Sequence, residues 1–234
     1  MLMDSATFWA MFSTLLRGLA VTLLLTVSTV AFGMMLALPV ALARNASNRY
    51  LRAFGTLFIF FFRGPPLLVQ LYLVYYGLPQ FTWLRESFAW ILLKEPIGCA
   101  IVALSLNSAA YVAEILSSAL RNVPRGEVEA AEVAGFSALT RFRLVTLPHM
   151  ARIALRSYGN ELVFIIKGTS VASLVTVIDL MGAAQIIYFR TYDPFTPLLA
   201  AGAIYFALVF TVTRGIAWTE RRLSPEFRLR GIAR

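Results

Sequence analysis

The side chains of this chain that could do chemistry are charged groups placed inside apolar stretches. Glu161 and Lys167 lie six residues apart in the segment GNELVFIIKGTS. On a helix this spacing separates two side chains by roughly 120°, so the pair cannot simply neutralise itself. Each group needs another partner: a neighbouring chain, water or a ligand. A desolvated carboxylate suits a cationic ligand group, and Lys167 with the hydroxyls of Thr169 and Ser170 could receive an anionic one.

Composition indicates that these groups lie in a membrane protein with several spans. Of 234 residues, 59% are hydrophobic and 14% are charged, and several apolar runs approach 20 residues. The net charge of +9 comes from basic clusters between the apolar runs, which membrane topology produces and a nucleic-acid-binding patch does not. One cysteine, Cys99, excludes a disulfide framework, and with one histidine, His149, it argues against a metal site. We expect His149 to be structural.

Further polar groups interrupt two other apolar runs. Asn107 and Glu114 are seven residues apart, which places them on nearly the same face of a helix. For Glu114, a structural pairing with an arginine and a contact with a ligand are both open. Arg63 directly precedes Gly64-Pro65-Pro66, where two missing backbone donors predict a kink or break in the helix.

A polar and basic island, EAAEVAGFSALTRFRLVTLP, separates two of the apolar runs. Its pattern predicts two short helices. The first runs from about Pro124 to Ala134 with Asn122 as its cap, and Gly135 stops it by entering the left-handed region. Ser137 caps the second helix, and Pro148 ends it. A short amphipathic helix between spans is suited to lying in a groove of another protein.

The island resembles the cytoplasmic signature of bacterial ABC-importer permeases: Glu-Ala-Ala, three residues, Gly, nine residues, Ile-x-Leu-Pro. The only departure is a valine in place of the isoleucine. The resemblance implies that seven residues couple the permease to an ATPase: Glu129, Ala130, Ala131, Gly135, Val145, Leu147 and Pro148.

Two other segments resemble polar amino acid importers, in particular the basic amino acid and opine branch. GNELVFIIKGTSV is similar to G-N-E, five residues, K-x-[ST]-S-L, with Val171 for leucine. RGPPLLVQ is similar to R-G-T-P-L-L-V-Q, with Pro65 for threonine. We expect the substrate site to comprise Glu161, Asn160, Lys167, Thr169, Ser170, Arg63 and Asn107. In the rival account, Glu161 pairs with Arg63 or with an arginine of a partner chain and only holds helices together.

Hydropathy predicts one all-α transmembrane domain, residues 1–234, with about five spans and a cytoplasmic coupling helix pair, as in type I ABC importers. The spans fall at about 18–43, 53–77, 97–120, 157–180 and 195–217, and the coupling loop at about 122–150. Arginines follow the first, third and fifth spans and precede the fourth. This asymmetry predicts an N-terminus outside and a C-terminus inside the cell. The resemblance implies that the membrane is the bacterial inner membrane, with the N-terminus in the periplasm and the C-terminus in the cytoplasm. The tryptophans of the external loop 78–96 suit a membrane interface.

The resemblance also implies partners. The complex would hold two permease chains, often different homologous chains in this branch, two ATPase subunits and a periplasmic substrate-binding protein. This chain lacks a G-x-x-x-x-G-K-[ST] sequence, so ATP and Mg would bind the ATPase partners and no cofactor would bind here. The implied function is ATP-driven import of polar, in particular basic, amino acids or opines by alternating access.

Two other classes of protein would place different demands on the sequence. A stand-alone channel or secondary carrier for a small polar solute would need no ATPase groove, so the match across the island would be coincidence. An intramembrane enzyme would need a nucleophile, a metal or an acid–base pair at membrane depth. Neither Glu114 nor Glu161 has a histidine or cysteine partner nearby in the sequence. Co-purification with an ATPase separates the importer from both.

Overall fold

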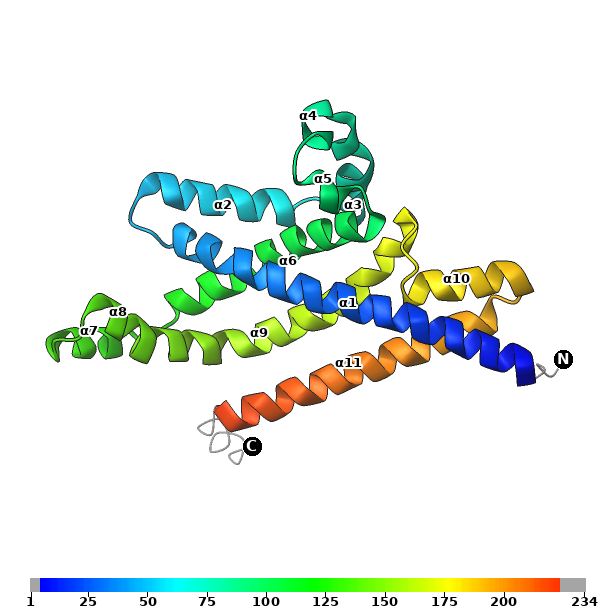
Figure 1. Ribbon diagram of the computed structural model, residues 1–234. Coiled ribbons are helices and arrows are strands. Elements are labelled where there is room, and N and C mark those ends of the chain that lie inside the picture. Colours follow the sequence, from blue (N-terminus) through cyan, green and yellow to red (C-terminus); the bar gives the residue numbers. More distant parts are fainter. Residues whose placement is uncertain (1–4, 224–234) are drawn as a thin grey trace.

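The computed structural model describes residues 5–223, with side chains for residues 9–222, and every regular element in that range is a helix (Figure 1). Three helices are long and apolar enough to cross a membrane: α1 (Ser5–Arg44), α6 (Pro96–Arg121) and α11 (Phe195–Leu223). Two further passages are helix pairs bent at a short break, by 97° and 48°. The prediction of an all-helical membrane protein with about five spans is confirmed.

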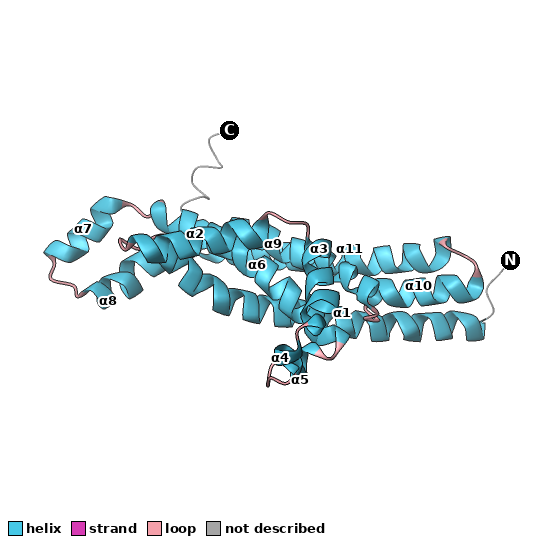
Figure 2. Cartoon of the chain, turned by 90° about the horizontal axis from the view of Figure 1, so that it is seen from above, coloured by secondary structure: helices cyan, strands magenta, loops and turns pink. Residues whose placement is uncertain are grey.

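Close packing of α1 on α6 forms the centre of the molecule (Figure 1). Small buried residues make the approach possible, as in other membrane helix pairs. At Gly33 of α1, a Cβ atom would lie only 3.2 Å from Ser108 Oγ of α6. Seen from above, α1, α10 (Leu180–Thr191) and α11 lie side by side at the end that holds the N-terminus, while α7 (Arg125–Val133) and α8 (Ala138–Arg141) lie at the opposite end (Figure 2).

The predicted break after Arg63 is confirmed. Helix α2 (Arg49–Arg63) stops at Gly64-Pro65-Pro66, and α3 (Leu67–Tyr72) leaves with the 97° bend. The break frees backbone carbonyls that the missing proline N–H groups cannot satisfy. Gln70 Nε2 donates to Phe62 O and to Pro65 O, both at 2.9 Å, and Asn107 Nδ2 donates to Phe62 O at 3.1 Å. Side chains from α3 and α6 therefore stabilise the break.

A small projection of short helices follows the break (Figure 1). Its elements are η1 (Leu73–Gly77), η2 (Leu78–Gln80), α4 (Thr82–Arg85) and α5 (Trp90–Leu93). Phe81, Trp83 and Ile91 are at least half exposed on it. An exposed aromatic surface of this kind suits the membrane interface predicted for this loop.

The second bend separates α9 (Leu147–Gly168) and the 3-10 helix η4 (Thr169–Val175) from α10. Thr176 adopts a left-handed conformation (φ 66°), and the buried Asp179 then caps α10 by accepting from Gly182 N at 2.9 Å. Thr22 of α1 accepts from Leu180 N at 3.0 Å. The segment that follows residue 180 is therefore helical to Thr191 and packs on α1.

Helix α11 begins after a capped turn. The Asp193 carboxylate accepts from Phe195 N at 3.0 Å, and the Thr196 hydroxyl donates to its other oxygen. The hydrogen bond from Thr196 is the main reason that the pKa of Asp193 lies below its usual value.

The polar island forms the predicted helix pair. Gly135 adopts φ 78°, the left-handed conformation expected of it, between α7 and α8. Ser137 caps α8, as predicted, by accepting from Thr140 N at 3.3 Å.

Two predicted ends of this pair are wrong. Asn122 does not cap α7: Pro124 occupies that position, and the Asn122 amide donates to Ser118 O at the end of α6. Pro148 does not end the second helix, because α8 continues through the π-helix η3 (Phe142–Thr146) into α9. A π turn displaces the carbonyl with which a proline ring would collide in an α-helix, so the chain passes Pro148 without stopping.

Candidate functional site

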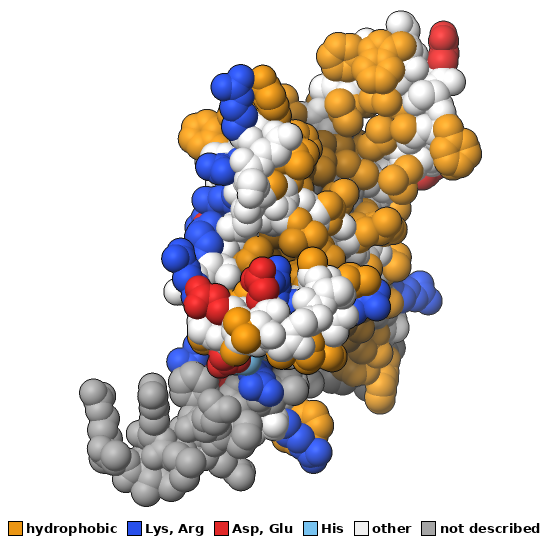
Figure 3. Space-filling view, turned by 90° about the vertical axis from the view of Figure 1, so that its left-hand side faces the viewer, with side chains coloured by type: hydrophobic (Ala, Val, Ile, Leu, Met, Phe, Trp, Pro, Cys, Tyr) orange, Lys and Arg blue, Asp and Glu red, His pale blue; other side chains and the backbone are white. Residues whose placement is uncertain are grey.

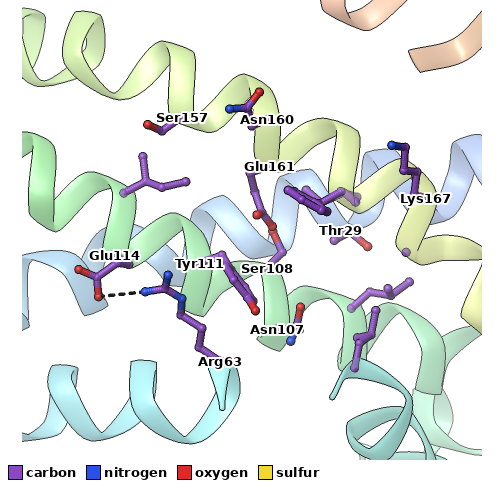
Figure 4. A pocket seen from close by; sticks show the side chains of 16 residues that line it. Thr29, Arg63, Asn107, Ser108, Tyr111, Glu114, Ser157, Asn160, Glu161 and Lys167 are labelled. Atoms are coloured by element: carbon purple, nitrogen blue, oxygen red, sulfur yellow. Dashed lines mark ion pairs between the residues drawn. The ribbon is translucent and has the colours of Figure 1, made fainter. Parts of the chain in front are cut away.

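A cavity of about 640 Å³ lies between α1, α2, α6 and α9 (Figure 4). Five of the seven predicted substrate residues line it: Arg63, Asn107, Asn160, Glu161 and Lys167. Its other polar lining residues are Thr29, Ser108, Tyr111, Glu114 and Ser157. Residues far apart in sequence, from Thr29 to Gly168, thus meet at one site.

Thr169 and Ser170 are not among the residues that line this cavity. Both lie in the 3-10 turn that follows α9, and both hydroxyls are used locally. Thr169 Oγ1 donates to Ile166 O at 2.8 Å, and Ser170 Oγ donates to Lys167 O at 2.7 Å. The geometry therefore supports a local role for these hydroxyls in the turn.

Glu161 is buried in the wall of the cavity, with 7% of its surface exposed. Figure 4 shows its side chain pointing from α9 towards Ser108 of α6. None of the ion pairs within residues 9–222 includes Glu161. A buried carboxylate with no positive partner is costly, so the site favours a positive charge at this position.

Glu114 is the opposite case, because three arginines surround it. It forms an ion pair with Arg44 of α1, and its carboxylate oxygens lie 3.6 Å from Arg63 Nη1 and 3.8 Å from Arg121 Nη2. The Arg63 guanidinium also lies over the Tyr111 ring, 5.1 Å from its centroid. Of the two roles open to Glu114, the structure shows the pairing with arginines, and Arg63 is bound there rather than at Glu161.

The two carboxylates give the cavity opposite electrostatic ends. One carboxylate cannot balance three guanidinium groups, so the end of the cavity near Glu114 attracts anions. A second cavity, of about 340 Å³, lies against the same cluster and shares Arg63 and Glu114 with the first. The Glu161 side of the larger cavity attracts cations. A molecule that carries both charges fits this arrangement.

Gln70, Thr29 and Ser108 matter in the structure and were missed in the sequence. Gln70 had a signal, since it is a polar residue in an apolar run shortly after two prolines. Thr29 and Ser108 gave no signal in the sequence, because small hydroxyl residues are common packing residues of membrane helices.

The helix pair α7 and α8 is held together by polar side-chain contacts. Glu132 Oε2 lies 2.6 Å from Arg141 Nη1, and Glu127 Oε2 lies 3.0 Å from His149 Nε2. His149 therefore has the structural role expected of it. The two pairs fasten α7 to the long helix that continues through α8 into α9.

The signature residues lie on α7, in the turn after it, and on η3 and the start of α9, with mixed exposure. Glu129, Ala130, Gly135 and Leu147 are exposed, Val145 and Pro148 are half-buried, and Ala131 is buried. Figure 3 views the end of the molecule that carries the pair, where acidic and basic side chains gather, and hydrophobic side chains cover much of the part above. Val133 is 90% exposed and Leu139 is 59% exposed. Such apolar groups on a polar helix pair mark a contact surface for another protein.

The fold and the cavity define a class: a multi-span helical membrane protein with a cavity among its helices that polar side chains line in part, and a projecting helix pair at one end. Residues 29–225 match the family described as binding-protein-dependent transport system inner membrane component, and the chain belongs to this family.

Relatives with known names align with this chain over most of its length. The octopine transport system permease protein OccM of Rhizobium meliloti is 41% identical over 225 residues, which covers 96% of this chain and 92% of that protein. The histidine/lysine/arginine/ornithine transport system permease protein HisM of Salmonella typhimurium is 38% identical and covers 88% of both chains. A solved structure of an amino acid ABC transporter superposes with a TM-score of 0.82 at 32% identity, over 95% of this chain and all of that one. The resemblance to ABC-importer permeases is confirmed, and a stand-alone channel or carrier is not favoured.

Proposed function

We propose that this permease imports amino acids that carry an additional positive charge, or opines, and that the larger cavity is its substrate site. The observation that carries the proposal is Glu161, a buried carboxylate on the wall of a polar cavity with no positive partner in the part of the chain that the structure describes. The names of the relatives agree, since they include octopine, nopaline and the basic amino acids.

The charges suggest how the substrate is oriented. Its ammonium group would lie at Glu161, where a charge-assisted hydrogen bond contributes about 1.5–3 kcal/mol. Its carboxylate would lie towards Lys167 or towards the arginines around Glu114. Asn160 is exposed on the same wall, whereas Asn107 already donates to Phe62 O. In this proposal Asn107 shapes the site by holding the break after α2.

The remaining components follow from family membership. We infer a second permease chain, two ATPase subunits that bind ATP and Mg, and a periplasmic substrate-binding protein. The seven signature residues, on α7, the turn at Gly135, η3 and the start of α9, would contact the ATPase. Its closure would move α9, which is one continuous helix from α8 through η3, and so change access to the cavity.

Glu161→Gln tests the site. It keeps the size of the side chain and removes its charge, so the complex should assemble and the binding protein should still stimulate ATP hydrolysis. Uptake of L-arginine or L-lysine into proteoliposomes should fall about tenfold or more, equivalent to about 1.4 kcal/mol. A neutral amino acid, where transported, should be affected less.

Glu220→Gln is the matched control. Glu220 pairs with Arg156 at 3.2 Å and is not among the residues that line the cavity, so its uptake should stay near wild type. Unchanged uptake of every substrate by Glu161→Gln would refute the site. Loss of assembly would instead favour the account in which Glu161 only holds helices together.

A further inference from the structure

Two buried hydroxyl groups lie on the wall of the larger cavity, next to the region that Glu161 enters. Thr29 of α1 is 1% exposed and Ser108 of α6 is 3% exposed, and both line the larger cavity. Within residues 9–222 the Thr29 hydroxyl oxygen makes no hydrogen bond, whereas the Ser108 hydroxyl is placed to donate to the Glu161 carboxylate. Other threonines of these helices behave differently: Thr26 Oγ1, for example, donates to Thr22 O at 2.8 Å.

A buried polar group without a partner costs free energy, and proteins seldom leave one unpaired. The cost is tolerated where a ligand supplies the missing partner. Because Thr29 borders a cavity large enough for an amino acid, the partner that its hydroxyl lacks is best placed inside that cavity. A Ser108 hydroxyl that donates to Glu161 keeps its own lone pairs free to accept from the same ligand group.

The two hydroxyls and Glu161 converge from three helices. Thr29 lies one helical turn before Gly33, on the same face of α1. That face runs against α6, since a Cβ at Gly33 would lie 3.2 Å from Ser108 Oγ. From the other side, Glu161 of α9 points at Ser108 (Figure 4). The cavity thus has three oxygen acceptors on one part of its wall.

The number of acceptors matches one kind of ligand group. A primary ammonium group carries three N–H donors, which diverge from one nitrogen and can reach one carboxylate and two hydroxyls. A guanidinium is planar and presents its donors as a rigid fork, which fits a carboxylate or a phosphate side-on. An N-substituted amino acid has only two N–H donors at its α-nitrogen, so one acceptor would remain unpaired.

We propose that Thr29, Ser108 and Glu161 form a site for a primary ammonium group of the substrate. The inference rests on the proposed function and narrows its substrate class to amino acids that carry a primary ammonium group. Substrates with a free α-amino group should be preferred over N-substituted ones, opines included. Glu161 supplies the charge, and the two hydroxyls supply the direction and number of the hydrogen bonds.

The experiment measures uptake by the reconstituted permease–ATPase complex at saturating binding protein. L-Arginine is the first probe, because its only primary ammonium is the α group, and Nα-methyl-L-arginine is the second. Thr29→Val and Ser108→Ala should each lower L-arginine uptake about tenfold, the loss of one hydrogen bond to a charged group. Each should lower uptake of the methylated probe clearly less. Comparing each variant with wild type on the same probe cancels the selectivity of the binding protein.

The chain offers matched controls. Ser105 of α6 is also buried and unpartnered, but it is not among the residues that line the cavity, so Ser105→Ala should transport L-arginine as wild type does. Thr26→Val removes a hydroxyl that is bonded to its own helix and should also be silent. Thr29→Ser keeps the hydroxyl and should restore most of the uptake that Thr29→Val loses.

The outcomes separate this inference from the function on which it rests. Wild-type uptake by Thr29→Val and Ser108→Ala, together with a defect in Glu161→Gln, would overturn the ammonium site and leave the proposed function standing. Equal losses in the cavity variants and in the two controls would show that the hydroxyls act only in packing. A wild-type complex that imports none of L-arginine, L-lysine and L-ornithine would contradict the proposed function itself.

Discussion

At the scale of single residues, the two carboxylates of the cavity show how environment decides a role. Glu114 and Glu161 both lie in apolar runs, yet one faces three guanidinium groups and the other has no ion pair in the described part of the chain. The arginines reach Glu114 from α1, α2 and α6, so this carboxylate joins three helices at one end of the cavity. The Glu161 carboxylate, by contrast, does not join helices through an ion pair in the described part of the chain.

Glu114→Gln should therefore destabilise the protein. Without the carboxylate, three guanidinium groups repel one another in a partly desolvated place, and we expect a loss of about 1–3 kcal/mol, reduced from the fully buried case because Glu114 is partly exposed. The thermal midpoint of the purified complex should fall clearly. Glu220→Gln, which breaks a single exposed pair, should change it little. Equal midpoints for the two variants would contradict the role of Glu114 as the shared partner.

The sequence could nominate these residues but could not assign their partners. A charge inside an apolar run is visible without a structure, and Arg63, Glu114, Glu161 and Lys167 were identified in that way. Which arginine meets which carboxylate depends on helix packing across 70 residues of sequence, as for Arg44 and Glu114. Hence the sequence left Arg63 open as a partner of Glu161, while the structure pairs it with Glu114.

At the scale of elements, local signals were read correctly where the cause is local. Gly135 and Ser137 shape their turns through their own backbone and side chain, and the double proline breaks its own helix. The bend at residues 176–179 contains neither proline nor glycine. It is stabilised by Thr22 of α1 and by Tyr205 of α11, whose hydroxyl donates to Asp179 at 3.1 Å, so no local pattern could reveal it.

Gly135→Ala tests the turn between α7 and α8. A Cβ at Gly135 would meet nothing within 4 Å, so any effect must come from its φ of 78°. An L-residue pays roughly 1–2 kcal/mol in this region, which should displace α8 relative to α7. We expect a folded complex in which the binding protein stimulates ATP hydrolysis poorly and uptake falls with it.

Gly126→Ala provides the comparison, because Gly126 lies within α7, has equally open space and has no positive φ. It should behave as wild type does. Gly135→Asn should be milder than Gly135→Ala, since asparagine tolerates the left-handed region. If Gly135→Ala couples transport to ATP hydrolysis normally, the turn is not part of the lever.

At the scale of the whole molecule, the long helices give the protein two distinct ends. The apolar part of α1 extends over 36 residues, or roughly 54 Å at 1.5 Å per residue, well beyond a hydrocarbon core of about 30 Å. The predicted first span, 18–43, is therefore only part of a helix that continues on the side of the N-terminus. The helix pair α7–α8 lies at the other end of the molecule (Figures 1 and 2).

This arrangement leads to a prediction of membrane orientation. Basic residues gather at the end that carries α7 and α8, so we expect that end to face the cytoplasm and the N-terminus to face the periplasm.

Single cysteines can be introduced in a Cys99→Ala background at four exposed positions: Arg49, Trp83, Arg125 and Arg190. In intact spheroplasts an impermeant maleimide should label positions 83 and 190, and it should reach positions 49 and 125 only after permeabilisation. Because Arg49 and Arg125 begin α2 and α7 at the same end of the molecule, the two must label together. Labelling of both in intact spheroplasts would invert the orientation, and labelling of only one would break the five-span arrangement.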